Sequence, residues 1–343
     1  MTDTQSIRQA LIAWNGAEVL DEFEPLDYVC HPLETREIGP VRILRSGLLA
    51  RRGMLVPGSI HAYAHRQREA RLRAIAGTIL RSARRLPGGR TYTIAHSDWS
   101  RGFFHWITEA VPRMIRARAA DPDCVLLLPH FPKISDVQRE TVAAMNFPVI
   151  EPLPAGGTFI VDRLRFVTVP PRKGEFDPAD LAAIRDHLRT RFGVSTPARR
   201  RIYVTRRDAF ARKVANEDAL VALLSRRGFE TVSAETLPFA EQVRLFGSAE
   251  ALVSIHGAGL TNMLWMPSGG AVLEFAKRRF PHDFAPVRRS NLLNPSYARM
   301  APLVGHRYAA IICDPVDPQA TARVADLVVD IDATRQALDR LAL

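Results

Sequence analysis

Short apolar runs alternate with amphipathic stretches along the chain, and this pattern sharpens after Thr91. Apolar runs bounded by turn residues are typical of buried strands, and apolar residues at three- and four-residue spacing are typical of helices with one buried face. We therefore expect strands at Thr91–Ala95, Cys124–Leu128, Leu164–Val169, Ile202–Thr205, Phe229–Val232, Leu252–Ile255, Val272–Phe275 and Tyr308–Cys313. We expect helices at Gly102–Arg118, Asp136–Met145, Pro178–Arg191, Asn216–Arg227, Pro238–Gly247 and Ala333–Leu343.

Two of these helices carry further signals. Pro112 predicts a kink or an early stop in the first of them, because proline has no N–H to donate. Asn216 is expected to cap the helix that it opens. Residues 1–90 give a weaker pattern, with apolar alternations at Val41–Leu44 and Gly47–Leu49 and an Arg-rich, helix-like stretch at Arg66–Arg85.

Strands that alternate with helices predict βαβ units and parallel sheets, so the expected fold class is α/β. With 343 residues the chain has room for two Rossmann-like domains. Gly193–Arg201 contains proline, is basic and has no apolar period, which marks a domain boundary. We expect an N-terminal domain over residues 1–195 and a C-terminal domain over residues 196–343, whose last helix can pack back on the first domain.

The composition is that of a globular protein, with 47% apolar and 24% charged residues, but Lys and Arg exceed Asp and Glu by 11. Such an excess favours a polyanionic partner, which can be nucleic acid, an anionic membrane face or a phosphorylated small molecule. The cysteines Cys30, Cys124 and Cys313 are far apart and suggest neither a zinc site nor a disulfide framework. We expect them to be buried thiols.

The beginning of the chain lacks the features of a signal peptide, and no apolar run is long enough to span a membrane. These features predict a cytoplasmic protein, and the basic excess allows peripheral association with the anionic inner face of a membrane. The sequence contains no P-loop and no G-x-S-x-G nucleophile elbow, which argues against the enzyme classes that use them.

The densest chemical signal is Ser254–Asn262, a turn with two glycines directly after an apolar strand. Glycines let the backbone approach a ligand closely, and the free N–H groups of a following helix bind anions. Open α/β sheets bind ligands at the carboxyl ends of their strands. A tight turn without a ligand is the alternative interpretation.

A second cluster lies between Arg199 and Lys213, where seven basic residues stand against one acidic residue. Arg206, Arg207 and Arg212 flank the end of a predicted strand, from which guanidinium groups can reach phosphate oxygens. A solvated basic surface is the alternative. Further along, Glu274 lies at the end of the expected strand Val272–Phe275. Its carboxylate can accept hydrogen bonds from both hydroxyls of a ribose, or it can have a structural role.

The third cluster places His105 and Glu109 on one face of a helix, at i and i+4. A carboxylate beside an imidazole fixes its tautomer and suits a general base, although a buried polar pair is also possible. Asp98, in the approach to this helix, is the reserve base. The D-x-D pattern of Asp121 and Asp123 precedes a strand where a metal-binding motif would follow one, so we expect no metal site.

Taken in this order, the clusters resemble glycosyltransferase family 61. The resemblance rests on Gly102–Arg113, Tyr203–Glu217 and Gly228–Glu274, and it covers roughly residues 91–280. Members of this family include plant xylan-decorating transferases, animal O-linked N-acetylglucosaminyl transferases and bacterial capsule or lipopolysaccharide proteins. Thr205 stands where the family commonly has Ser, and residues 1–90 resemble nothing in it, so we expect acceptor choice to reside there.

The resemblance implies a GT-B architecture, with two Rossmann-like domains facing across a cleft, and inverting sugar transfer without a metal or cofactor. The implied donor is a nucleotide-diphosphate sugar, with uridine as the expected nucleotide. The implied acceptor is a glycan or lipid-linked glycan in cell-surface polysaccharide synthesis. The lack of the disulfides and anchors of secreted eukaryotic members points to a bacterial, cytosolic version. The expected donor-binding residues are Arg206, Arg212, Lys213, His256, Gly257, Ala258, Gly259, Leu260, Thr261, Asn262 and Glu274.

In this interpretation His105, oriented by Glu109, takes the proton of the acceptor, Glu274 holds the ribose, and Thr261 or Asn262 reaches a phosphate or the sugar. Two other classes of function remain open. One is a catalytically inactive glycan-binding protein on the same fold. The other is a basic nucleic-acid-binding protein, which is disfavoured because the Arg199–Lys213 loop lacks basic residues interleaved with stacking aromatics.

Overall fold

The structure, a computed structural model, describes residues 3–44, 47–61, 64–79, 83–97, 99–128, 135–153, 158–170, 172–194, 199–279, 292–321 and 324–343. Its internal contacts divide the chain into two compact units. Unit 1 consists of Cys30–Leu188, and unit 2 consists of Asp3–Val29 together with Arg189–Leu343. The division falls inside helix α7 (Pro178–Arg191).

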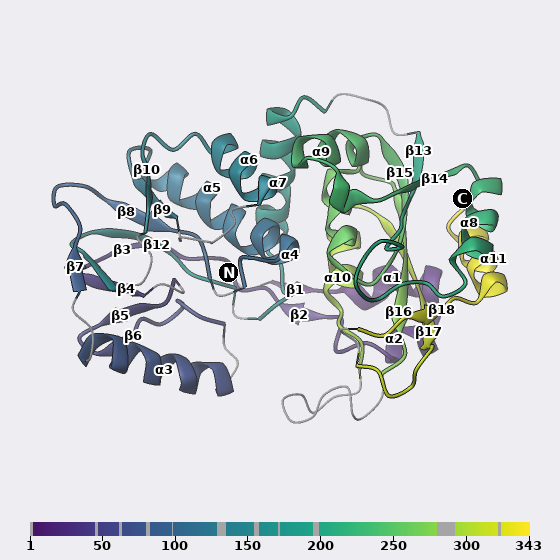
Figure 1. The fold of residues 1–343 in the computed structure, drawn as a ribbon, viewed down its shortest axis with the longest axis horizontal. Helices are drawn as coiled ribbons and strands as arrows, with labels where there is room; N and C mark the ends of the chain where they lie inside the picture. The colour runs from purple at the N-terminus through teal and green to yellow at the C-terminus, as the bar shows by residue number, and fades with distance from the viewer. Residues whose placement is uncertain are drawn as a thin grey trace. The chain divides into compact units, whose positions relative to one another are not determined.

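Unit 1 contains two five-stranded sheets (Figure 1). In the first sheet, β10, β9, β8 and β12 pair in parallel in that order, and β3 pairs antiparallel with β12 at the edge. The strands are β10 (Ile150–Pro152), β9 (Val125–Leu128), β8 (Tyr92–Ile94), β12 (Leu164–Val167) and β3 (Thr35–Ile38). In the second, the order is β6-β5-β4-β11-β7, formed by Met54–Leu55, Leu49–Arg51, Val41–Leu44, Thr158–Val161 and Ala83–Arg85. Both sheets contribute to one apolar core, for example through Ile94 and Phe159.

The helices of unit 1 follow the βαβ pattern that the sequence predicts. Between β8 and β9 the chain forms α4 (Phe103–His105), a π-helical turn (Trp106–Ala110) and α5 (Val111–Ala120). Between β9 and β10 it forms α6 (Asp136–Ala144), which begins with a capping box. Helix α3 (Ala64–Ile79) packs against the β5–β6 edge of the second sheet.

Unit 2 has a six-stranded sheet in the order β14-β13-β15-β16-β17-β18. The bounds in chain order from β13 are Arg200–Val204, Phe229–Val232, Ala249–Ile255, Ala271–Lys277, Arg307–Pro315 and Leu327–Val328, and β18 alone pairs antiparallel. Counted along the chain, the parallel strands have the order 2-1-3-4-5 of a doubly wound sheet. The direction of winding reverses between β13 and β15, and such a switch point is where open α/β sheets bind ligands.

Helices cover both faces of this sheet (Figure 1). Helices α8 (Glu217–Arg226) and α11 (Ile331–Arg340) contact each other on one face. On the other face α9 (Phe239–Gly247) and α10 (Ser296–Leu303) both contact a 3₁₀ helix (Ala258–Trp265), and a shorter 3₁₀ helix spans Ala234–Thr236. The described residues thus form an α/β protein with parallel and mixed sheets, as the sequence predicts.

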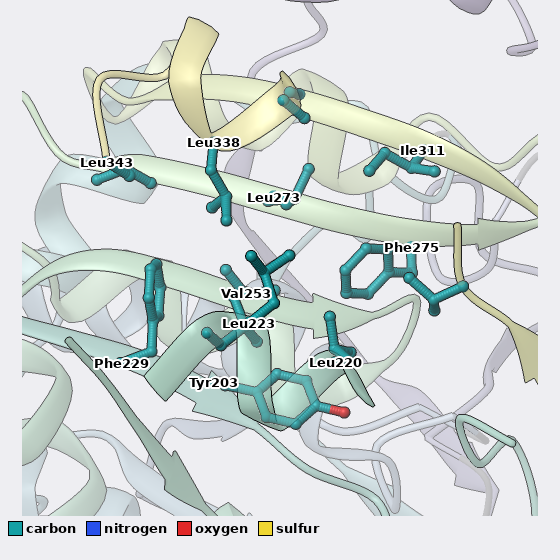
Figure 2. Packing of buried hydrophobic residues seen from close by; sticks show 14 of the residues in the cluster. Tyr203, Leu220, Leu223, Phe229, Val253, Leu273, Phe275, Ile311, Leu338 and Leu343 are labelled. Carbon is teal, nitrogen blue, oxygen red and sulfur yellow. The ribbon is translucent and has the colours of Figure 1, made fainter. Parts of the chain in front are cut away.

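Figure 2 shows the core beneath α8 and α11, where Leu223 and Leu338 meet Val253 and Leu273 of the central strands. Each fully buried leucine of this kind contributes about 2 kcal/mol of hydrophobic stabilisation. This packing holds β13 and β15 in register, with Val204 beside Ser254. The Ser254 hydroxyl donates to the Val204 carbonyl at 3.0 Å, so the two carboxyl ends are also tied by a side chain.

The first residues of the chain belong to unit 2, which the expected division at residues 195 and 196 does not include. Helices α1 (Ile7–Asn15) and α2 (Ala17–Asp21) pack against β17, while β1 (Thr4–Gln5) and β2 (Tyr28–Val29) pair with each other. The Asn15 amide donates to the Tyr308 carbonyl and accepts from the Ala310 N–H, each at 2.8 Å. A side chain that satisfies two strand groups explains why this segment joins a sheet so distant in sequence.

Several local predictions need correction. The helix predicted at Gly102–Arg118 is interrupted by the π-helical turn just before Pro112, which has no N–H to continue the α-helical ladder. Asn216 is the N-cap residue of α8, but its side chain bonds Val329 instead of the helix. Helix α11 packs on α8 and β17, and Arg340 donates to the Trp14 carbonyl, so the last helix does contact the first residues of the chain, which belong to unit 2. The three cysteines are buried thiols, as predicted.

Candidate active site

A buried carboxylate organises the first group of polar residues, which lies in unit 1. Glu109, whose side chain is 6% exposed, accepts a hydrogen bond from His105 Nδ1 at 2.6 Å through Oε1. Its Oε2 lies 3.2 Å from Nε2 of His61. Burial alone would raise the pKa of Glu109, but the bonds to His105 and His61 outweigh it and hold the pKa at about 2, so the group is a carboxylate.

His105 has the geometry of a general base. Its Nδ1 is committed to Glu109, and a neutral ring that donates from Nδ1 keeps its lone pair on Nε2. The imidazole is 16% exposed, against 5% for His61, so of the two rings His105 is the more accessible to a substrate. Trp99 stacks on the His61 ring and meets His105 edge-on, with centroids 5.1 and 4.8 Å away. Asp98, the reserve base, lies outside the described residues.

The local sequence explains how this group is held. The π-helical turn contains Glu109, and π-turns are frequent at functional sites. One turn later Arg113, 2% exposed, donates to the carbonyl oxygens of Ala95 at 2.7 Å and Val167 at 2.9 Å. Ala95 directly follows β8 and Val167 is the last residue of β12, so one guanidinium fixes the ends of both strands. Burial lowers the pKa of Arg113 to about 10, which still leaves it charged at neutral pH.

The second group lies in unit 2, at the switch point of the sheet. Arg206 and Arg212 come from the loop after β13, and Gly257 comes from the loop after β15. A Cβ atom on Gly257 would stand 3.6 Å from Nη1 of Arg212 and 3.9 Å from Nη1 of Arg206. The missing side chain therefore leaves open the space between two guanidinium groups. We call Arg206, Arg212 and Gly257 the switch-point cradle.

Among the described residues no carboxylate pairs with Arg206 or Arg212, whereas the neighbouring Arg207 is neutralised. Arg207 donates to Glu217 at 2.8 Å and to Asp218 at 2.6 Å. By contrast, the contacts recorded for Arg206 and Arg212 in the described residues are to main-chain carbonyls, and the Nε atoms of both are buried without a hydrogen-bond partner there. Burial and the proximity of Arg206 lower the pKa of Arg212. Two unneutralised cations at a switch point are suited to an anionic ligand.

A second histidine–carboxylate pair borders the cradle. Glu274, 1% exposed, accepts from His256 Nδ1 through one oxygen and from the Tyr308 hydroxyl at 2.7 Å through the other. The Arg212 guanidinium donates to the His256 carbonyl at 3.3 Å. Each oxygen of Glu274 accepts one hydrogen bond, which orients the His256 ring, and the expected role of Glu274 as a ribose ligand stays a prediction.

The other residues of the predicted turn form a short helix, and several of their side chains are buried in the core. Ala258, Gly259, Leu260, Thr261 and Asn262 begin a 3₁₀ helix, not an α-helix. Leu260 is fully buried, and Asn262 bonds Gln242 at 3.3 Å and Trp265 at 3.0 Å. Thr261 is fully buried. These three side chains hold the turn in shape, so the role predicted for Thr261 or Asn262 in touching phosphate or sugar is not supported by their placement.

A cavity opens beside the cradle within unit 2. Its described lining includes Arg212, His256, Glu274, Lys277 and Asn294. Lys213 is not part of this lining; its main chain bonds Asp326 and Leu327 instead. The sequence analysis missed Lys277, although strand β16 extends two residues past its predicted end and carries this lysine to the strand exit.

The Arg199–Lys213 loop carries an exposed aromatic side chain. Phe210 lies between the cradle arginines in sequence and is 99% exposed. The loop therefore does present an aromatic ring to solvent, in contrast to the expectation. In the part of the chain that is described, no three His, Cys, Asp or Glu residues are placed to hold a metal ion. None of its helices is both long and apolar enough to cross a membrane.

The described residues form an α/β protein with two arginines at the switch point of one sheet and a buried histidine–carboxylate pair in the other unit. Comparison with known proteins makes this specific, since residues 103–273 match the family described as Glycosyltransferase 61. The matched range contains His105, Glu109, both cradle arginines and His256. The chain belongs to glycosyltransferase family 61.

Curated relatives give the same result over shorter segments. The chain is 33% identical over 90 residues to the EGF domain-specific O-linked N-acetylglucosamine transferase of Drosophila melanogaster, covering 25% of this chain and 17% of that protein. It is 40% identical over 79 residues to protein O-linked-mannose beta-1,4-N-acetylglucosaminyltransferase 2 of Bos taurus, covering 22% and 13%. The protein of that name from Canis lupus familiaris is 39% identical over 79 residues, with equal coverage. The similarity thus spans less than a fifth of each relative.

Proposed function

We propose that this protein is an inverting, metal-independent glycosyltransferase with a nucleotide-diphosphate sugar as donor, the nucleotide being uridine diphosphate. The acceptor is a glycan or lipid-linked glycan in cell-surface polysaccharide synthesis. The observation that carries the proposal is the switch-point cradle, because Arg206 and Arg212 lie beside Gly257 and no carboxylate among the described residues pairs with them. Guanidinium forks match the geometry of phosphate oxygens.

The donor diphosphate occupies the cradle in this proposal. Lys277 adds positive charge in the adjoining cavity, which His256, oriented by Glu274, also lines. When the bond between the anomeric carbon and the phosphate oxygen breaks, negative charge grows on the leaving diphosphate. Preorganised donors that stabilise such developing charge are worth about 3 kcal/mol each in the barrier.

The acceptor hydroxyl attacks the anomeric carbon from the opposite side, which inverts its configuration. The new oxygen–carbon bond forms as the carbon–phosphate oxygen bond breaks, and the hydroxyl proton passes to Nε2 of His105. Glu109 stabilises the resulting imidazolium through Nδ1. This step requires donor and acceptor to meet within reach of His105, and the GT-B arrangement of two facing domains is the part of the proposal that provides for it.

Location is also part of the proposal. The excess of 11 basic residues suits a cytoplasmic protein that binds the anionic inner face of a bacterial membrane, where lipid-linked glycans are made. Co-sedimentation with vesicles that contain phosphatidylglycerol, but not with purely phosphatidylcholine vesicles, tests this. Binding to both or to neither contradicts it.

The alternative is a catalytically inactive glycan-binding protein on the same fold. Donor binding and donor turnover separate the two. We expect uridine diphosphate and UDP-N-acetylglucosamine, chosen because the relatives are named for N-acetylglucosamine transfer, to raise the melting temperature by several degrees near saturation. Slow hydrolysis of the nucleotide sugar should accompany this. Stabilisation without any release of uridine diphosphate would favour the inactive alternative.

The matched variants are Arg206→Ala, in the cradle, and Arg335→Ala, an exposed residue of α11 that pairs with Asp332. Arg206→Ala should abolish the stabilisation by uridine diphosphate, and Arg335→Ala should leave it unchanged. If Arg206→Ala responded to the nucleotide as the unaltered protein does, the diphosphate would not lie in the cradle.

A further inference from the structure

Nothing in the sequence singled out His61, and it lies outside the residues matched by the family. In the structure it is buried in unit 1, where its ring is 5% exposed. Nδ1 lies 2.7 Å from the carbonyl oxygen of Pro170, and Nε2 lies 3.2 Å from Oε2 of Glu109. Both ring nitrogens therefore face oxygen acceptors.

These contacts decide how many protons the ring carries. The Pro170 carbonyl can only accept, so Nδ1 must hold a hydrogen. A neutral ring would then turn the lone pair of Nε2 toward a carboxylate oxygen, and two acceptors would be buried against each other. A second proton on the ring removes this conflict, because an imidazolium donates from both nitrogens. The carboxylate supplies the countercharge that a buried cation needs.

We propose that His61 is a buried imidazolium that positions Glu109 and so holds the base His105 in its working tautomer. The site is then a chain of three side chains, in which His61 occupies one carboxylate oxygen and His105 the other. The segment before the family match thus supplies a positioning residue to the site. The kinetic part of this inference rests on the proposed function, whereas the protonation state of His61 does not.

The charge of His61 also sets the strength of the base. Glu109 faces His61 and His105, and the buried Arg113 acts on it electrostatically. The ammonium group of Lys173 lies 5.2 Å from the centroid of the Phe104 ring, and that ring meets His105 edge-on. With His61 charged, part of the carboxylate's charge is balanced, so His105 attracts its catalytic proton less strongly than it would beside an isolated carboxylate.

Long-range proton–nitrogen NMR of histidine-labelled protein tests the protonation state directly. At pH 7.5 we expect one ring with both nitrogens protonated, and its signal should disappear from spectra of His61→Gln. In Glu109→Gln this ring should carry a single proton, because the countercharge is gone. A singly protonated His61 in the unaltered protein would overturn the proposal, whatever the protein's activity.

The kinetic test uses His61→Gln, with hydrolysis of UDP-N-acetylglucosamine as readout and circular dichroism to verify folding. We expect kcat to fall by tenfold or more with little change in KM, and the acidic limb of kcat/KM to move to higher pH by roughly one unit, because a cation beside Glu109 has been removed. A merely structural role would lower activity without moving that limb, and would refute the positioning role. His61→Asn, which fills less of the space, serves the same test if the first variant unfolds.

Discussion

Arg206 and Arg212 repel each other in the free protein, and this repulsion has a measurable consequence for stability. Nη1 of Arg212 stands 3.6 Å and Nη1 of Arg206 stands 3.9 Å from the position of a Cβ on Gly257, so the two nitrogens are at most 7.5 Å apart. At that separation Coulomb's law gives a repulsion of about 0.5–2 kcal/mol for an effective dielectric constant between about 80 and 20. The cradle therefore costs stability in the absence of ligand.

The variant Arg212→Gln removes the positive charge. The variant Arg212→Lys keeps the charge but loses the planar guanidinium group, so the two form a matched pair. Without ligand, we expect Arg212→Gln to melt about 1–5 °C above Arg212→Lys at low salt. The gap should narrow at 0.5 M salt, because salt screens interactions between partly exposed charges. Arg212→Gln should gain nothing from uridine diphosphate.

Differential scanning fluorimetry with and without nucleotide measures both effects. A lower melting temperature for Arg212→Gln than for Arg212→Lys would show that the two guanidinium groups do not repel each other. A full response of Arg212→Gln to uridine diphosphate would show that the anion binds elsewhere. Either result would refute the reasoning that the cradle is built for a diphosphate.

Three other changes give distinct results. Gly257→Ala should weaken binding of uridine diphosphate at least tenfold by calorimetry without unfolding the protein, since its φ of 168° suits any residue and the added methyl meets only ordinary contacts. Unchanged affinity would contradict this. Arg113→Met should lower the free energy of unfolding by about 2–5 kcal/mol in urea, because buried carbonyls lose their donor; a loss below 1 kcal/mol would contradict it. The stabilisation that Glu109 gives is complete above pH 4.5 and is lost as the pH falls toward its folded pKa of about 2. The free energy of unfolding in urea should therefore depend less on pH between these values in Glu109→Gln than in the unaltered protein. Equal pH dependence in the two proteins would refute the assignment.

Local patterns in the sequence were enough to predict most elements after Thr91. Helix Pro178–Arg191 and strand Phe229–Val232 have the predicted bounds, because proline, glycine and the apolar period mark both ends. The pairing of His105 with Glu109 also followed from spacing, since i and i+4 are neighbours on a helix.

What could not be predicted depends on contacts between distant residues. The second oxygen of Glu274 accepts a hydrogen bond from Tyr308, which lies on a neighbouring strand. This bond can be identified only once the order of strands in the sheet is known. His61 lies in a stretch without helical or strand periodicity, and its contacts come from Glu109 and Pro170. Helix α1 has an apolar face that fits many surfaces, and the bonds of Asn15 to β17, which help to place it, form only in the folded sheet.

The discontinuous composition of unit 2 has a consequence for how the chain folds. Asn15 and Tyr308 are 293 positions apart, so on the ribosome α1 is synthesised long before the strand that it packs against. Contacts of such high sequence separation form late, since closing a long loop costs entropy before any contact repays it. We therefore expect unit 1, one uninterrupted stretch of chain, to fold first during translation. A fragment made to isolate unit 2 must join Asp3–Val29 to Arg189–Leu343, because a fragment that starts at Arg189 would expose the face of β17 that α1 covers.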